Sequence, residues 1–310
     1  MPVKTLRIGS RGSALALAQT HWVRDRIARL YPDIEVAVRI IKTSADRQPQ
    51  MSLRTGTSIG VWVKELEDAL LAGEVEIAVH SMKDLPTVIP DGLEIGAVPE
   101  REDARDALVA APGINSLADL PPACVVGAGS IRRRSQILAL RPDFHLQDIR
   151  GNVDTRLQKL DRGDYDAIVI ACAGMNRLGL EGRITCALEF CDMLPAPGQG
   201  ALAVQVRRKD EWISALLGGI HHAPSATAVR AERTFLRLLG GGCNSPVGVH
   251  ASFDGGALSI AGLIAAPDGT QVIRERVRKD SGVADDAAAE LVEALLHKGG
   301  DALLRSVGRL

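Results

Sequence analysis

The chain has 310 residues, which is long enough for two or three domains and a sizeable hydrophobic core. Lysine and arginine number 37 and aspartate and glutamate number 38, so the net charge is -1. This balance argues against a general nucleic-acid or membrane-surface binder, because both need an excess of basic residues. The longest uninterrupted apolar run, residues 167–175, is about half of what a membrane-spanning helix needs.

The five cysteines are irregularly spaced, and no Cys-x-x-Cys pair occurs. Neither a disulfide framework nor a zinc site is indicated, and no other metal-ligand spacing is evident. Lys4, Arg7 and Arg11 near the N-terminus have no apolar stretch behind them, which does not match a secretory signal. We therefore expect a cytoplasmic protein without a bound metal.

Short apolar runs alternate with longer helical patterns over the first 220 residues. We expect strands at residues 6–9, 35–41, 77–80, 93–98, 107–110, 124–127, 167–171 and 202–206, several of them apolar nearly throughout. We expect helices at residues 13–30, 62–72, 131–140 and 153–161. This alternation predicts parallel sheets covered by helices, as in an α/β protein.

The pattern changes after about residue 220. A helical stretch at 226–239 is followed by strand-like runs at 257–265 and 271–277, joined through Pro267-Asp-Gly269, and by a helix at 283–297. These elements predict a small α+β domain. Turn-rich joints at 99–106, 194–200 and 217–224 separate the blocks. Two α/β lobes would leave a cleft at the carboxyl ends of their strands, where ligands of open sheets bind.

Six arginines and no lysines lie between Val126 and Arg156, and arginine favours forked capture of carboxylates. Arg132-Arg-Arg134 follows a glycine turn at a helix start, where free backbone N–H groups already favour an anion. Arg150-Gly-Asn-Val-Asp-Thr-Arg156 repeats this arrangement at a second strand-to-helix joint. The alternative for the three adjacent arginines is a solvated helix face. A dinucleotide-binding motif at Gly127-Ala-Gly129 is weak, because Arg132 occupies the third glycine position.

Three further segments carry candidate chemistry. Ser10-Arg-Gly-Ser13 joins the first strand to the first helix, so Ser10 or Ser13 can cap that helix. Lys83-Asp84 follows a strand end and can stabilise a cation or transfer a proton, although such pairs are often inert surface charges. Cys243 lies in the glycine-rich loop 239–248 and could be a nucleophile, a metal ligand, an attachment point or part of a plain turn.

These segments together make the chain resemble the porphobilinogen deaminase (hydroxymethylbilane synthase) family over nearly its whole length. The resemblance rests on nine ordered motifs: IGSRGSALALAQ (8–19), VKELE (63–67), IAVHSMKDLP (77–86), REDARD (101–106), GAGSIRR (127–133), RGNVDTRL (150–157), AGMNRLGL (173–180), PAPGQG (195–200) and GGC (241–243). It implies an α/β fold of two lobes like those of periplasmic binding proteins, plus a small C-terminal α+β domain. The implied domains are residues 1–99 with 200–217, residues 105–193 and residues 222–310.

The resemblance implies a transferase that condenses four porphobilinogen molecules head to tail, releases ammonia each time, and then frees the linear tetrapyrrole by hydrolysis. It implies a dipyrromethane cofactor bonded covalently to the sulfur of Cys243. Asp84, ionised beside Lys83, is implied to hydrogen-bond the pyrrole N–H groups and to stabilise developing positive charge. We expect hinges in the joints at 99–106 and 194–200.

The resemblance also assigns the remaining site residues. The implied cofactor ligands are Ser13, Ser81, Lys83, Asp84, Arg132, Arg133, Asn152 and Arg156. The implied substrate ligands are Arg11, Gln19, Trp62, Arg150, Arg156, Arg177 and Gln199. A monomer that binds the small-molecule substrate porphobilinogen, but neither nucleic acid nor a membrane, completes the expectation.

The chain departs from the family pattern in residues 53–62. Thr55 and Ile59 stand where the family commonly has lysines, and Trp62 stands where phenylalanine is usual, although it can still stack on a pyrrole. The lost positive charge argues against a lid role for this segment, and Arg47 and Arg54 are the residues that could compensate for the lost charge. Two alternatives remain: a cytosolic two-lobed anion-binding protein without turnover, and a relative that binds the cofactor but turns over poorly.

Overall fold

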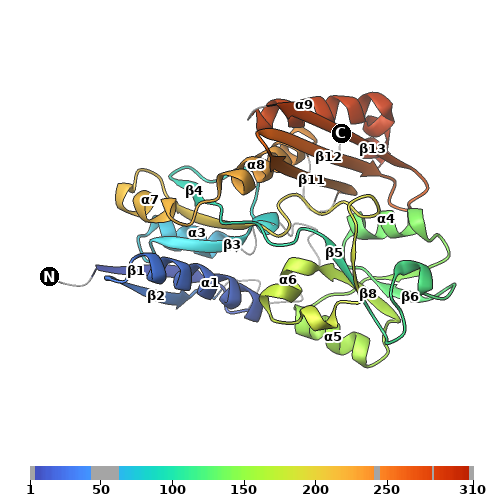
Figure 1. The fold of residues 1–310 in the computed structure, drawn as a ribbon, viewed down its shortest axis with the longest axis horizontal. Helices are drawn as coiled ribbons and strands as arrows, with labels where there is room; N and C mark the ends of the chain where they lie inside the picture. Colours follow the sequence, from blue (N-terminus) through green and yellow to red (C-terminus); the bar gives the residue numbers. More distant parts are fainter. Residues whose placement is uncertain (1–3, 43–62, 241–244, 281–282, 307–310) are drawn as a thin grey trace. The chain divides into compact units, whose positions relative to one another are not determined.

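The computed structural model describes residues 4–42, 63–240, 245–280 and 283–306. The chain divides into two compact units, which we call unit 1 and unit 2. Unit 1 contains Met1–Arg101 and Ala201–Ala226, and unit 2 contains Glu102–Gly200 and Thr227–Leu310. Two of the unit boundaries therefore fall inside the joints predicted at 99–106 and 194–200. Figure 1 shows the elements of both units along the chain.

Unit 1 is built on a five-stranded sheet with the order β2-β1-β3-β10-β4. The strands are β1 (Lys4–Ser10), β2 (Ile34–Ile40), β3 (Ile77–Ser81), β4 (Leu93–Ala97) and β10 (Leu202–Arg207). β1, β2 and β3 run parallel, whereas β10 runs antiparallel to β3 and β4. As a result, β10 begins at the edge of the sheet where β1 and β3 end.

The helices of unit 1 cover both faces of this sheet. They are α1 (Ala14–Leu30), α3 (Lys64–Leu71) and α7 (Glu211–Gly218). Alternate residues of β3 serve different cores: Ile77 and Val79 pack in the cluster that contains α1, and Ala78 packs in the cluster that contains α3. Burial on both faces explains why β3 is apolar nearly throughout.

Unit 2 contains a second five-stranded sheet, with the order β7-β6-β8-β5-β9. The strands are β5 (Asp106–Ala110), β6 (Val125–Gly127), β7 (His145–Gln147), β8 (Ala167–Ala171) and β9 (Cys186–Leu188), and the helices are α4 (Ile131–Leu140), α5 (Val153–Asp161) and α6 (Cys172–Arg177). β6, β7 and β8 are parallel, and β5 is antiparallel to both of its neighbours. The two sheets thus share one pattern of strand directions.

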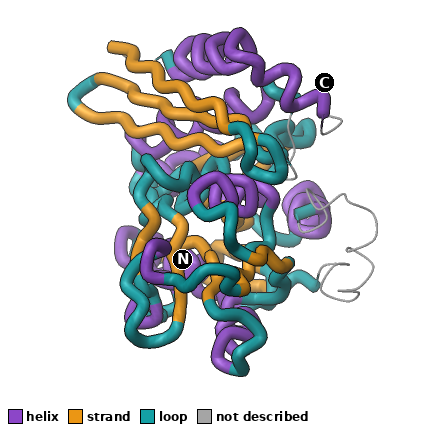
Figure 2. The backbone as a smooth tube through the Cα atoms, turned by 90° about the vertical axis from the view of Figure 1, so that its right-hand side faces the viewer, coloured by secondary structure: helices purple, strands orange, loops and turns teal. Residues whose placement is uncertain are grey.

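The rest of unit 2 is a three-stranded antiparallel sheet in the order β11-β12-β13. Its elements are β11 (Val247–Asp254), β12 (Ala257–Ala265) and β13 (Val272–Asp280), with helices α8 (Ala223–Leu238), α9 (Ala284–Leu295) and α10 (Asp301–Ser306). Figure 2 shows helices layered on one side of this sheet. Gly262 allows this close packing, because a Cβ there would lie 2.9 Å from Leu291 and 3.0 Å from Phe235.

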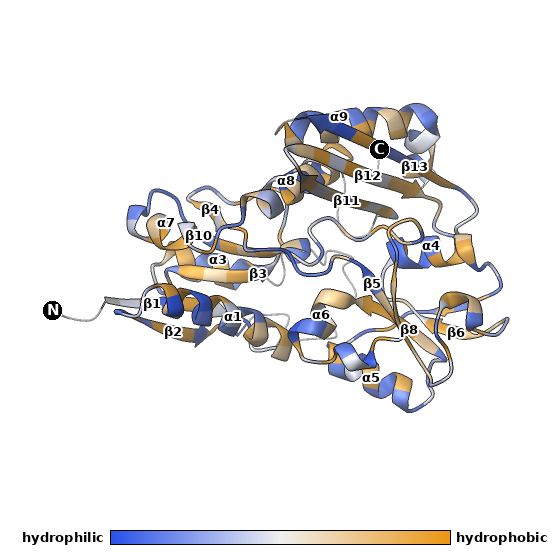
Figure 3. Cartoon of the chain, viewed as in Figure 1, coloured by the Kyte–Doolittle hydropathy of each residue, from blue (hydrophilic) through white to orange (hydrophobic). Residues whose placement is uncertain are grey.

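The expected mixed α/β architecture, with two sheet-and-helix lobes and a small C-terminal sheet domain, is confirmed. Strands such as β3 and β8 are largely hydrophobic, whereas helices such as α5 and α9 carry both hydrophobic and hydrophilic residues (Figure 3). Within the described ranges, no helix is long and apolar enough to cross a membrane. The same ranges contain no group of three or more histidine, cysteine, aspartate or glutamate side chains that could hold a metal ion.

Candidate active site

In unit 1, the predicted site residues gather at the carboxyl ends of β1 and β3. Ser13 is the N-cap of α1, and its Oγ accepts a hydrogen bond from the backbone N–H of Ala16 at 3.3 Å. Gln19, buried on α1, donates from Nε2 to Oγ of Ser81 at 2.8 Å. The helix cap thus starts α1 at the edge where β3 ends, and α1 brings Gln19 onto the last residue of β3.

Asp84 lies on a single 3₁₀ turn, Met82–Asp84, directly after β3. Met82 holds this turn in place, because its side chain is buried and its N–H donates to the carbonyl of Ala201 at 3.0 Å. The side chain of Asp84 is exposed and makes no hydrogen bond or ion pair within the described part of the chain. An exposed carboxylate on a fixed turn can meet a cationic or N–H-bearing ligand without reorganisation.

Three buried polar side chains that were given no role in the sequence analysis lie behind this turn. Gln205 of β10 donates from Nε2 to Oε1 of Glu67 on α3 at 2.9 Å, and His80 is buried on β3, which pairs with β10. Burial lowers the pKa of His80 to about 4, so the imidazole is neutral, and burial raises the pKa of Glu67. These residues link β3, β10 and α3 at the base of the Ser81–Asp84 segment.

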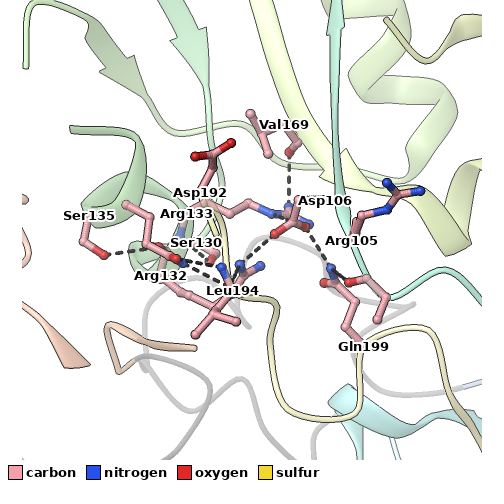
Figure 4. Close-up of polar contacts among 12 residues, drawn as sticks. Arg105, Asp106, Ser130, Arg132, Arg133, Ser135, Val169, Asp192, Leu194 and Gln199 are labelled. Carbon is pink, nitrogen blue, oxygen red and sulfur yellow. Dashed lines mark hydrogen bonds and ion pairs between the residues drawn. The ribbon is translucent and has the colours of Figure 1, made fainter. Parts of the chain in front are cut away.

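In unit 2, Arg132 and Arg133 meet at a carboxylate that the sequence analysis did not single out, that of Asp106 (Figure 4). Arg132 donates from Nη1 to Oδ2 of Asp106 at 2.7 Å, and Arg133 donates from Nη2 to Oδ1 at 2.7 Å. Gln199 adds a third donor, with Nε2 at 2.9 Å from Oδ1. Asp106 is fully buried, and both arginines are nearly so. Three predicted site residues are therefore held by one buried carboxylate.

The strand directions explain this convergence. The parallel strands β6 and β8 end at one edge of the sheet, and the antiparallel β5 begins there, with Asp106 paired to Ala171 at the end of β8. Ser130 caps α4 by accepting from the N–H of Arg133 at 3.3 Å, which starts the helix at the same edge. The predicted strand-to-helix joint thus brings its arginines to the first residue of the neighbouring strand.

The electrostatics of this cluster are unbalanced. Burial on its own would raise the pKa of Asp106, but the guanidinium groups of Arg132 and Arg133 hold it well below its usual range. Burial lowers the pKa of Arg132. Two guanidinium groups share one carboxylate, so one positive charge remains without a counter-charge in these contacts. A buried excess of positive charge is stabilised when an anion binds beside it.

The second arginine-bearing joint, between β7 and α5, lies against the first. A Cβ on Gly129 would lie 2.4 Å from the carbonyl oxygen of Ile149, so the two joints touch through their backbones. Arg156 donates from Nε to the carbonyl of Gly151 at 2.8 Å, and within the described ranges its guanidinium makes no other hydrogen bond or ion pair. Burial, helped by repulsion from Arg133, lowers the pKa of Arg156 to about 10.

The other predicted residues of unit 2 have different surroundings. Arg150 is exposed and forms an ion pair with Asp148, and Asn152 is exposed at the N-cap position of α5 without capping through its side chain. Arg177, at the end of α6, donates from Nη2 to the carbonyl of Gly200 at 2.6 Å, and burial lowers its pKa to about 10. Cys243 and Trp62 lie outside the described residues, as do Arg47, Arg54, Thr55 and Ile59.

These residues fit a ligand that carries several carboxylates. Four arginines of the two joints are predicted ligands, and in the contacts described they meet only two carboxylates, those of Asp106 and Asp148. Two positive charges therefore remain for a ligand: one is shared by Arg132 and Arg133, and the other is on Arg156, whose guanidinium has unused donors. Arginine binds carboxylates through paired N–H groups, which suits the acetate and propionate groups of a dipyrromethane.

Comparison with known proteins shows the family to which the sequence is similar. The sequence model of the family described as "Porphobilinogen deaminase, dipyromethane cofactor binding domain" matches residues 6–215, and that of the porphobilinogen deaminase C-terminal domain matches residues 226–298. The porphobilinogen deaminase of Thermus thermophilus is 45% identical over 306 residues, covering 98% of this chain and 100% of the relative. That of Deinococcus radiodurans is 44% identical over 310 residues, covering 98% and 99%.

The chain belongs to the porphobilinogen deaminase family. Membership confirms the expected hydroxymethylbilane synthase function, the transferase class and the dipyrromethane cofactor. It does not support the alternative of a two-lobed anion-binding protein without turnover.

Solved structures resemble the fold more distantly. A methionine-binding protein matches with a TM-score of 0.45 and 11% identity, covering 72% of this chain and 92% of that one. A periplasmic solute-binding protein from Desulfovibrio salexigens matches with a TM-score of 0.43 and 10% identity, covering 71% and 72%.

Two signals in the sequence point to residues that the analysis left without a role. Asp106 is a carboxylate placed directly before the apolar run 107–110, where a buried strand begins. His80 is a titratable residue inside the apolar run that ends at Ser81. Polar residues in such positions are buried and hydrogen-bonded when the strand is covered on both faces.

Proposed function

We propose that Asp84 is the catalytic residue of this enzyme, and that the arginines of unit 2 hold the carboxylates of cofactor and substrate. The observation that carries the proposal is the excess of guanidinium groups over carboxylates where β6 and β7 end. Each porphobilinogen brings two carboxylates, so a chain of several units accumulates a strongly anionic load that needs local positive charge.

Asp84 acts on the ring nitrogen of the substrate. As the bond between the substrate's methylene carbon and its amino group breaks, the amine leaves as ammonia and positive charge develops on the pyrrole nitrogen. The carboxylate of Asp84 accepts a hydrogen bond from that N–H and stabilises the charge. Lys83, next to it, keeps the local potential from becoming purely negative. When bound, the dipyrromethane supplies the free pyrrole α-carbon that the first substrate joins.

We propose Cys243 as the covalent attachment point of the cofactor. Ser13, Ser81, Lys83, Asp84, Arg132, Arg133, Asn152 and Arg156 are the proposed cofactor ligands. Arg11, Gln19, Trp62, Arg150, Arg156, Arg177 and Gln199 are the proposed substrate ligands. In this assignment Asp106 holds Arg132, Arg133 and Gln199 in place rather than meeting a ligand, because it has no exposed surface.

The organisation of the chain is also part of the proposal. We propose three domains, at residues 1–99 with 200–217, 105–193 and 222–310, and hinges in the joints at 99–106 and 194–200. We further propose a cytoplasmic monomer. We also propose that it binds neither nucleic acid nor a membrane, which the net charge of -1 supports.

A colour assay tests the function directly. The purified protein is incubated with porphobilinogen, and the mixture is then acidified and oxidised by air. We expect porphobilinogen to be consumed and the absorbance of uroporphyrin to develop, because the released linear tetrapyrrole closes and oxidises under these conditions. Unconsumed porphobilinogen and no colour would contradict the proposed turnover.

A further inference from the structure

Arg150 is held by a carboxylate of its own joint. Its Nε lies 2.6 Å from Oδ2 of Asp148, and the side chains of the two residues are 58% and 46% exposed. Asp148 is the first residue after β7, and Arg150 follows it by two positions. Within the described ranges, Arg150 has no other side-chain partner, so Asp148 is the group that any ligand carboxylate would have to replace.

The carboxylates of Asp106 and Asp148 differ in how strongly they bind their arginines. Asp106 is fully buried between Arg132 and Arg133, and breaking a buried pair leaves uncompensated charge, so these contacts are permanent. The pair of Asp148 and Arg150 is exposed on both sides, and exposed ion pairs contribute little because water replaces them readily. A ligand carboxylate can therefore displace Asp148 but cannot displace Asp106.

Asp148 also affects the pKa of Arg156, a second residue that is predicted to bind cofactor and substrate. Its charge raises the pKa of Arg156, against the lowering caused by burial and by Arg133. One carboxylate therefore lies within electrostatic reach of both arginines of the motif Arg150–Arg156. A substrate carboxylate approaching this motif meets two attractive guanidinium groups and the competing carboxylate of Asp148.

We propose that Asp148 sets the affinity of this joint for substrate carboxylates, by occupying Arg150 until a substrate carboxylate takes its place. The inference rests on the proposed role of Arg150 as a substrate ligand. An enzyme that adds several units in succession must let each carboxylate leave Arg150 again. Because Asp148 can pair with Arg150 again, a substrate carboxylate can leave this guanidinium reversibly.

Three variants test this inference in the holoenzyme. Asp148→Asn removes the competing charge and keeps the size of the side chain, and Asp148→Glu keeps the charge. Asp164→Asn is the matched control, because Asp164 and Arg162 form an exposed ion pair with the same two-residue spacing in the same lobe, at 2.9 Å. KM and kcat for porphobilinogen are measured for each variant at low and at high salt, with the melting temperature as a check on folding.

We expect Asp148→Asn to lower KM about two- to fivefold at low salt, the range set by a weak exposed pair, with a smaller change in kcat. High salt should shrink this difference, since it screens the competing charge. Asp148→Glu should restore a KM close to that of the wild type, and Asp164→Asn should leave KM unchanged.

An unchanged or raised KM in Asp148→Asn would overturn the inference, because Asp148 would then be a bystander or would orient Arg150 for the substrate. An equal drop in KM for Asp164→Asn would overturn it as well, since general surface charge would explain the effect. If the wild-type enzyme in the same assay consumed no porphobilinogen, the proposed function would fail first and this inference with it.

Discussion

Asp106 and Arg133 are joined by two hydrogen bonds to a single carboxylate oxygen, with Nε and Nη2 of Arg133 lying 3.1 and 2.7 Å from Oδ1 of Asp106. The third nitrogen of Arg133, Nη1, donates to the carbonyl of Val169 on β8 at 3.2 Å. One arginine thus ties the start of β5 to β8 and to its own helix α4. The position of Arg133 is therefore fixed by the sheet and does not depend on a bound ligand.

Replacing Asp106 by asparagine should destabilise the fold strongly. Two buried guanidinium groups would lose their carboxylate, and losing one partner of a buried pair costs roughly 3–5 kcal/mol. Urea denaturation of wild type and Asp106→Asn measures this loss of unfolding free energy. Asp161→Asn is the control, because its ion pair with Arg183 is exposed and should matter little. Equal stabilities of the Asp106 variant and the wild type would contradict the buried pair.

Replacing Asp84 by alanine should abolish turnover and leave the fold intact. The carboxylate has no partner in the described ranges, so its removal breaks no contact there, whereas loss of one charge-stabilising group typically costs on the order of 100- to 1000-fold in rate. The initial rate of porphobilinogen consumption and the melting temperature are measured together. A variant with a near-normal rate would refute the role proposed for Asp84.

The stability of the protein should depend on pH through His80. Burial lowers its pKa from 6.5 to about 4 in the folded chain, so the unfolded chain binds more protons between these two values. His80 therefore leaves stability unaffected above pH 6.5 and reduces it as the pH falls toward 4, by on the order of 3 kcal/mol in all. His80→Leu should flatten this part of the stability profile, measured by denaturation at several pH values. An unchanged slope would show that His80 is not buried as a neutral ring.

Gly129 should not tolerate a side chain. A Cβ at this position would lie 2.4 Å from the carbonyl oxygen of Ile149, so Gly129→Ala must push the two arginine-bearing joints apart. We expect a lower melting temperature and impaired loading of the cofactor, seen as a lower fraction of modified protein by mass. Gly182→Ala is the control, since nothing lies within 4 Å of its added Cβ. If both variants behaved like the wild type, the close contact between the joints would be wrong.

Much of the fold could be predicted from hydrophobic runs alone. The strand predicted at 167–171 and the helices predicted at 131–140 and 153–161 have the observed bounds, because β8 is buried throughout and both helices begin after a clear turn. β7 and β9 were missed, since each has only three residues. β11 was also missed, although its residues alternate: Val247, Val249 and Ala251 face the core, and Gly248, His250 and Ser252 interrupt the apolar run.

For the site, the arginines could be predicted from the sequence, but their carboxylate partners could not. The glycine turns and helix starts located Arg132, Arg133, Arg150 and Arg156, because each motif is local in sequence. Their counter-charges could not be found in that way. Asp106 is more than twenty residues away from Arg132 and reaches it only because β5 runs antiparallel to β8, which is a property of the sheet and not of the motif. Local patterns therefore predicted the cations but not the carboxylates that hold them.

The mass of the intact protein tests the central claim most directly. After native purification, the account predicts the mass of the polypeptide plus a two-ring pyrrole group, with the thiol of Cys243 protected from alkylation and the extra mass located on the peptide that contains it. A bare polypeptide mass, an alkylatable Cys243 and no gain of mass after incubation with porphobilinogen would contradict it.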